Sequence, residues 1–156
     1  MKEAKQRLIA RGACPCGQVK FEITVPAVWA WHDHSAASRR AHGAFCATYV
    51  GSWLSRFRLT EGEEGVRRWE EPETRAVRSF CGQCGAPLFY QRARSKKMIN
   101  IARALFHEGT GREPRYHIAI DQTPDWAYEG QPLVPLKGYP GVVWERPRKR
   151  RTGGLV

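Results

Sequence analysis

Short stretches in which apolar and polar residues alternate, separated by glycine and proline, run along most of this chain. The clearest is Gln18–Val25, where every second residue is apolar and charged or polar residues stand between. A period of two is typical of a half-buried strand. Its apolar face consists of Val19, Phe21, Ile23 and Val25. Other segments rich in β-branched and aromatic residues predict further strands: Ala47–Thr60, with room for two strands around Gly51, and Ala76–Phe80, Pro87–Gln91, Lys97–Ala102 and Tyr116–Asp121.

One segment, Ser35–His42, predicts a short helix, with Ser35 as N-cap and Gly43 as the stop. Many short strands and few short helices predict a mainly β fold. The length of 156 residues suits one domain, which we place at residues 1–130. Residues 131–156 form an extension. The stretch Gly130–Val143, where the extension begins, is rich in Pro and Gly, which favours an extended, wrapping segment.

The end of the chain is strongly basic. The whole chain has 26 Lys and Arg against 15 Asp and Glu, a formal charge of +11. Five of these positive charges stand close together in the tail, at Arg146, Arg148, Lys149, Arg150 and Arg151. We expect salt-sensitive contact of this tail with nucleic acid or another polyanion. The alternative is that the tail only aids solubility.

The number of cysteines and the N-terminal sequence indicate in which cellular compartment the protein works. Five cysteines cannot all pair, and the first residues contain no apolar run of the kind a secretory signal needs. No stretch approaches the length of a membrane span. These features predict a cytoplasmic protein with reduced thiols and no membrane contact.

Four of the cysteines form two closely spaced pairs. The pairs are Cys14-Pro15-Cys16-Gly17 and Cys81-Gly82-Gln83-Cys84-Gly85. A glycine after each second cysteine allows a tight turn that aims backbone N–H groups at thiolates. Four sulfurs complete a tetrahedral structural zinc site, so we predict one structural Zn ion. The alternative is a redox dithiol in the second pair, but strand-like residues flank it where a thioredoxin-type motif would open a helix.

The fifth cysteine, Cys46, stands in an apolar run, Ala44–Val50. We interpret it as a buried, inert side chain. A reactive thiol is the alternative.

Three stretches together make the sequence resemble a known family: Gly12–Glu22, Ser38–Phe45 and Arg78–Leu88, with weaker support from Tyr116–Ile118 and Asp125-Trp126. The chain resembles the glutathione-dependent formaldehyde-activating enzymes, a family that includes centromere protein V-like proteins, over about residues 8–130. The resemblance implies a β-tent fold of small antiparallel sheets around a structural zinc. It implies Cys14, Cys16, Cys81 and Cys84 as the ligands, and carbon–sulfur lyase chemistry on the glutathione adduct of formaldehyde.

The chain departs from this family at one stretch. Active members carry a second zinc in a C-H-C-x-x-C-R-K sequence, where this chain has Asp33-His34-Ser35-Ala36-Ala37-Ser38 before Arg39-Arg40. Serine hydroxyls are poor zinc ligands near neutral pH, whereas thiolates bind strongly. We therefore expect the second zinc to be absent and the ordinary activity to be lost or altered. A cleft for a small thiol adduct could remain.

Three alternatives stay open at the sequence level. His32, Asp33, His34, His42 and Cys46 lie close in sequence and could rebuild a metal site, or these histidines are solvated. Ser35 or Ser38 as an activated nucleophile would need an oriented base and an oxyanion hole. As a function from another class, the chain could be a basic, zinc-stabilised binding module for nucleic acid or a protein partner.

Overall fold

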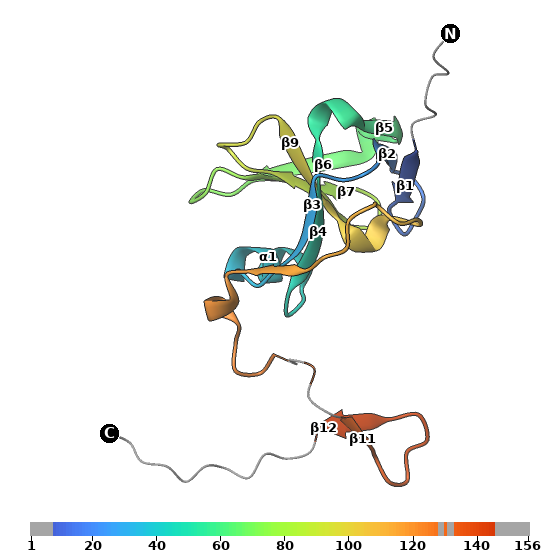
Figure 1. The fold of residues 1–156 in the computed structure, drawn as a ribbon, viewed down its shortest axis with the longest axis vertical. Coiled ribbons are helices and arrows are strands. Elements are labelled where there is room, and N and C mark those ends of the chain that lie inside the picture. Colours follow the sequence, from blue (N-terminus) through green and yellow to red (C-terminus); the bar gives the residue numbers. More distant parts are fainter. Residues whose placement is uncertain (1–7, 128–129, 131–132, 146–156) are drawn as a thin grey trace. The chain divides into compact units, whose positions relative to one another are not determined.

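The computed structural model describes residues 8–127, 130 and 133–145, and it is mainly β (Figure 1). The chain divides into two compact units, residues 1–123 and 124–156, which are described separately. The first unit has one α-helix, α1 (Ala36–His42), and ten strands. The strands are β1 (Ile9–Ala13), β2 (Lys20–Thr24), β3 (Trp29–Asp33), β4 (Ala47–Trp53), β5 (Phe57–Glu61), β6 (Val66–Glu70), β7 (Val77–Cys81), β8 (Pro87–Gln91), β9 (Met98–Ala102) and β10 (Tyr116–Ile118). Four short 3₁₀ turns are η1 (Leu54–Arg56), η2 (Glu63–Gly65), η3 (Arg103–Leu105) and η4 (Ile120–Gln122).

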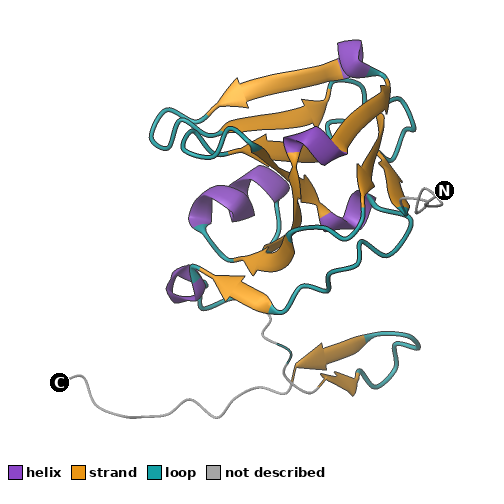
Figure 2. Cartoon of the chain, turned by 45° about the horizontal axis from the view of Figure 1, so that its top comes forward, coloured by secondary structure: helices purple, strands orange, loops and turns teal. Residues whose placement is uncertain are grey.

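Two sheets make up this unit (Figure 2). The larger has seven strands in the order β10-β3-β4-β9-β8-β7-β6, and the smaller has three in the order β1-β2-β5. All neighbours are antiparallel except β10 and β3, which are parallel. The prediction of a mainly β fold is confirmed.

The alternating face of Gln18–Val25 forms part of the core. Val19, Phe21 and Ile23 are at most 1% exposed. The ring of Phe21 meets those of Phe89 and Phe106 edge-on, with centroids 5.5 and 5.3 Å apart. Because Phe89 belongs to the larger sheet, these aromatic contacts join the two sheets in one core.

The predicted helix is also confirmed. Ser35 caps α1 by accepting a hydrogen bond from the Ser38 N–H at 3.2 Å, and Gly43 ends the helix in the left-handed region. This cap fixes the start of α1 immediately after β3.

The region predicted as one or two strands, Ala47–Thr60, contains two, but they divide at η1 rather than at Gly51. Strand β4 runs straight through Gly51, whose register partner on β3 is Trp29. A Cβ at Gly51 would lie 2.5 Å from the Trp29 ring. The glycine therefore serves close packing of the indole rather than a turn.

In the first unit, three strands escape the sequence analysis, namely β1, β3 and β6. Strand β1 buries only small groups, Ala10 and Gly12, so it lacks an apolar pattern. Strand β6 is an edge strand in which only Val66 is buried. In β1 and β6, backbone pairing with a neighbouring strand stabilises the element, although the side chains show no alternating apolar pattern.

In the second unit, the structure shows a hairpin where the sequence suggested an extended, wrapping segment. Strands β11 (Leu133–Pro135) and β12 (Val143–Glu145) pair antiparallel, and the Leu136 N–H donates to the Val142 carbonyl at 2.9 Å. The basic tail that follows, Arg146 to Arg151, lies outside the described residues. Its contact with polyanions stays a prediction. Among the described residues, no helix is long and apolar enough to cross a membrane.

Candidate functional site

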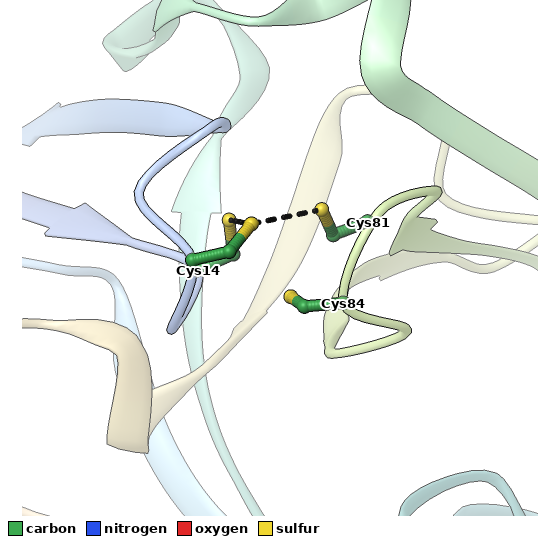
Figure 3. A group of neighbouring side chains, drawn as sticks. Cys14, Cys81 and Cys84 are labelled. Carbon is green, nitrogen blue, oxygen red and sulfur yellow. Dashed lines mark hydrogen bonds between the residues drawn. The ribbon is translucent and has the colours of Figure 1, made fainter.

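Four cysteine sulfurs meet where two tight turns face each other (Figure 3). Cys14 and Cys16 come from the turn between β1 and β2, and Cys81 and Cys84 from the turn between β7 and β8. Their four sulfur atoms lie within 4.8 Å of one another. The Cys14–Cys16 and Cys16–Cys81 sulfur distances are 3.4 and 3.7 Å. The cluster joins the smaller sheet to the larger one across 64 residues of intervening chain.

The local sequence explains how each turn presents its sulfurs. Gly17 and Gly85 have φ values of 76° and 72°, which glycine adopts without strain. Their N–H groups donate to the Cys14 and Cys81 carbonyls at 2.9 and 2.8 Å and close the turns. The Val19 N–H then points at the Cys14 sulfur, 3.3 Å away. Such N–H groups stabilise a thiolate.

The electrostatics of the cluster call for a cation. Hydrogen bonds from the backbone of Ala86 and Cys16 lower the pKa of Cys84 to about 7. A backbone hydrogen bond at Gln18 favours the Cys16 thiolate, but burial and three neighbouring sulfurs outweigh it and raise the pKa of Cys16 to about 12. Four thiolates in contact repel one another, so all four ionise together only around a positive ion.

The donor set suits one metal ion. Tetrahedral coordination with metal–sulfur bonds of about 2.3 Å places sulfurs about 3.8 Å apart, close to the spacing here. Cys81 ends a strand and Cys84 precedes another, so the second pair does not open a helix as a redox dithiol would. Among the residues the structure describes, the four cysteines are the group of three or more metal-binding side chains whose ligand atoms lie close enough to share one ion.

The positions where the resemblance implies the second zinc lie at the start of α1. Asp33 is 4% exposed and Ser38 is 1% exposed. The Asp33 carboxylate accepts from the Ser38 hydroxyl at 2.8 Å and from the Ser35 N–H at 2.9 Å. The Ser35 hydroxyl in turn accepts from the Ser38 N–H as the helix cap. The three positions converge as a ligand set would, but hydrogen bonds connect them.

The neighbouring histidines do not join this set. His34 lies on the opposite face of the sheet from Asp33, and its Nε2 is 2.9 Å from Nδ1 of His117. His32 shares a face with His34, as the sequence suggested, and contacts the Thr48 hydroxyl at 2.9 Å. His42 instead contacts the Tyr49 hydroxyl at 2.7 Å. The suggested site of His32, Asp33, His34 and His42 is therefore not assembled.

A cavity of about 300 Å³ lies at the C-terminal end of α1; Asp33 and Ser38 do not line it, but Ser38 contacts Tyr49, which does. The end of α1, through His42, forms one wall, and Tyr49, Trp69, Arg78 and Tyr90 contribute others. The sequence analysis missed Tyr49, Arg78 and Tyr90 as site residues. No motif marks them, since they come from three strands, β4, β7 and β8.

A polar network lines the cavity. Arg78 Nη1 donates to the Tyr49 oxygen at 3.2 Å, and its Nε donates to the buried carboxylate of Glu71. Burial and the nearby Arg78 charge lower the pKa of His42, against an opposing effect of Asp33. Burial raises the pKa of Tyr49 to about 12. At neutral pH the Tyr49 hydroxyl therefore keeps its proton and shares a hydrogen bond with the His42 ring.

Cys46 is half-buried rather than buried, and it lies just before β4. Burial and the Asp33 charge raise the pKa of its thiol. The thiol stays protonated at neutral pH, which fits an inert side chain better than a nucleophile. Likewise, the Ser35 hydroxyl accepts from the Ser38 N–H, and the Ser38 hydroxyl donates to Asp33 and contacts Tyr49, so neither hydroxyl is paired with a histidine base.

Two comparisons with known proteins bear on this architecture. The family model described as "Glutathione-dependent formaldehyde-activating enzyme" matches residues 9–122. A solved structure of a Rhodobacter sphaeroides protein from structural genomics is similar in fold, with a TM-score of 0.55 and 23% identity. The match covers 69% of this chain and 98% of that chain. Residues 9–122, which the family model matches, include both cysteine turns, the Asp33–Ser38 segment and the residues that line the cavity.

Proposed function

Because the chain belongs to the glutathione-dependent formaldehyde-activating enzyme family, we propose that it is a member with one structural zinc and an altered second site. Cys14, Cys16, Cys81 and Cys84 would hold the zinc. With four protein ligands the ion has no open position, so its chemistry is to crosslink the two sheets. The spacing and convergence of the four sulfurs support this assignment.

The hydrogen bonding of Asp33 carries the second half of the proposal. A carboxylate that accepts from the Ser35 N–H and the Ser38 hydroxyl already has partners for both oxygens. One carboxylate and two neutral hydroxyls form a weak donor set for zinc compared with three thiolates. We therefore expect no second tightly held zinc and loss or alteration of carbon–sulfur lyase activity.

The cavity at the C-terminal end of α1 supports retained ligand binding. Its volume suits a small molecule, and aromatic rings with a few hydroxyl and imidazole groups are typical of such sites. A small thiol adduct of the kind that the family handles is the ligand class we propose.

Metal analysis of the natural chain and of a variant with three added cysteine ligands tests the proposal. The purified protein should retain one zinc per chain after exposure to a mild chelator. The triple variant Asp33→Cys, Ser35→Cys and Ser38→Cys should retain two, because the segment already brings these positions together. Turnover of glutathione with formaldehyde should be absent from the natural chain. Two tightly held zincs in the natural chain, or ordinary turnover, would contradict the proposal.

A further inference from the structure

Three histidines gather on one face of the larger sheet. His32 and His34 alternate along β3 and its continuation, so their side chains lie on the same side. The parallel register of β10 places His117 beside His32. Asp33 pairs with Ile118 and Ala47 and belongs to the other face. The cluster is therefore separate from the Asp33–Ser38 segment.

Two of these rings lie in contact. Nε2 of His34 and Nδ1 of His117 are 2.9 Å apart. The other nitrogen of His34, Nδ1, lies 3.3 Å from the Thr123 hydroxyl. When His34 donates its Nδ1 proton to Thr123, its Nε2 presents a lone pair to His117. A metal-binding histidine is oriented in the same way, by a hydrogen bond from its second nitrogen to an oxygen.

The separation of the two nitrogens suits a shared ion. Two nitrogens at about 2.1 Å from a metal, with an angle between 90° and 110°, lie about 3.0–3.4 Å apart. The observed 2.9 Å therefore needs only a small opening of the pair. Without an ion, His117 donates its Nδ1 proton to the Nε2 lone pair of His34; with an ion bound, His117 would carry its proton on Nε2 instead and offer Nδ1 to the ion.

Of the two residues, His117 is open to solvent, whereas His34 is buried and held in place. His117 is exposed, so an ion reaches it from solvent, and water completes the coordination. His34 is 6% exposed, and its backbone N–H donates to the Ile118 carbonyl of β10 at 3.0 Å. The backbone thus holds the two rings beside each other before any ion arrives.

His32 supports the pair without joining it. Its ring centroid lies 4.8 Å from that of His117, and its Nδ1 contacts the Thr48 hydroxyl.

We infer that His34 and His117 form a second metal site, independent of the cysteine cluster, for a late first-row divalent ion. Imidazole ligands suit Ni²⁺, Cu²⁺ and Zn²⁺. An ion there would crosslink the three-residue edge strand β10 to β3.

Titration of Ni²⁺ into zinc-loaded protein without a histidine tag tests this site. The natural chain should bind one Ni²⁺ while its zinc content stays constant. His117→Ala should weaken Ni²⁺ binding by more than about tenfold. Loss of a residue that only orients a metal ligand already costs about tenfold or more, and loss of the ligand itself costs more than that. His107→Ala is the matched control, because His107 is also exposed but lies outside the cluster.

Two more variants separate this site from its surroundings. Thr123→Val should weaken Ni²⁺ binding while leaving the fold and zinc content intact. Ser38→Ala should leave Ni²⁺ binding unchanged, because Ser38 lies in α1 and contacts Asp33, which belongs to the other face of the sheet. Absence of Ni²⁺ binding to the natural chain, or equal binding by His117→Ala, would overturn the site. Neither result bears on the zinc count, which tests the proposed function.

Discussion

The cysteine cluster and the Asp33–Ser38 segment are the two places where the family resemblance implies a metal, and they satisfy their polar groups differently. The cluster brings four sulfurs from two distant turns within 4.8 Å of one another, and a cation between them would favour their ionisation as thiolates. The segment brings its three positions together within six residues, and one carboxylate accepts the available hydrogens. On the proposed function, convergence of side chains does not suffice for a metal site, because the chemistry of the donors decides what holds them together.

The largest expected effect comes from breaking the cysteine cluster. Cys81→Ser should abolish zinc retention and destabilise the fold by several kcal/mol at least, since structural zinc contributes on the order of 10 kcal/mol in small zinc domains. Cys81 is fully buried, so the effect includes a misplaced polar group. Metal analysis and chemical denaturation measure both quantities. Cys46→Ser is the control and should retain zinc; equal loss of zinc in both variants would contradict the assignment.

A smaller effect is expected from the segment that lacks thiolates. Asp33→Ala should lower the free energy of unfolding by about 2–3 kcal/mol, because it removes an acceptor of two hydrogen bonds and leaves the buried Ser38 hydroxyl without its partner. Zinc content should stay at one per chain. If Asp33→Ala instead loses a tightly held metal, the contrast between the two regions fails.

The helix cap tests a single bond within the same segment. Ser35→Ala should cost about 1 kcal/mol, because it removes the acceptor for the Ser38 N–H at the start of α1. The measurement is the urea midpoint beside that of Ala37→Ser, a change inside the helix that leaves the cap in place. An unchanged midpoint for Ser35→Ala would show that the cap contributes little.

The smallest expected effect is a pH dependence from His42. Its pKa in the folded chain is lowered, chiefly by burial, so the unfolded chain binds protons more readily below about pH 6.5. The stabilising contribution is fully present above that pH and is lost as the pH falls through the lowered pKa. His42→Gln should flatten the fall in stability between pH 7 and pH 5, while His107→Ala should retain it. Denaturation curves at several pH values provide the readout.

Local patterns predicted the local elements well. The alternation in Gln18–Val25 marked a buried strand face, and Ser35 with Gly43 marked both ends of α1. The patterns failed where neighbours supplied the stability. Strand β6 has four exposed residues, and β1 buries only small groups, so neither differs in sequence from a loop. Gly51 looked like a break but serves the close approach of Trp29.

By itself, the sequence determined that the fold is mainly β and which four cysteines belong together. Both follow from short-range spacing: a period of two for strands, and paired cysteines followed by glycine. Only the tertiary structure decided which side chains from different strands meet. It joined Tyr49, Arg78 and Tyr90 around a cavity, sent Asp33 and His34 to opposite faces, and set His117 against His34. Such contacts depend on strand register, and a shift of one residue moves a side chain to the other face.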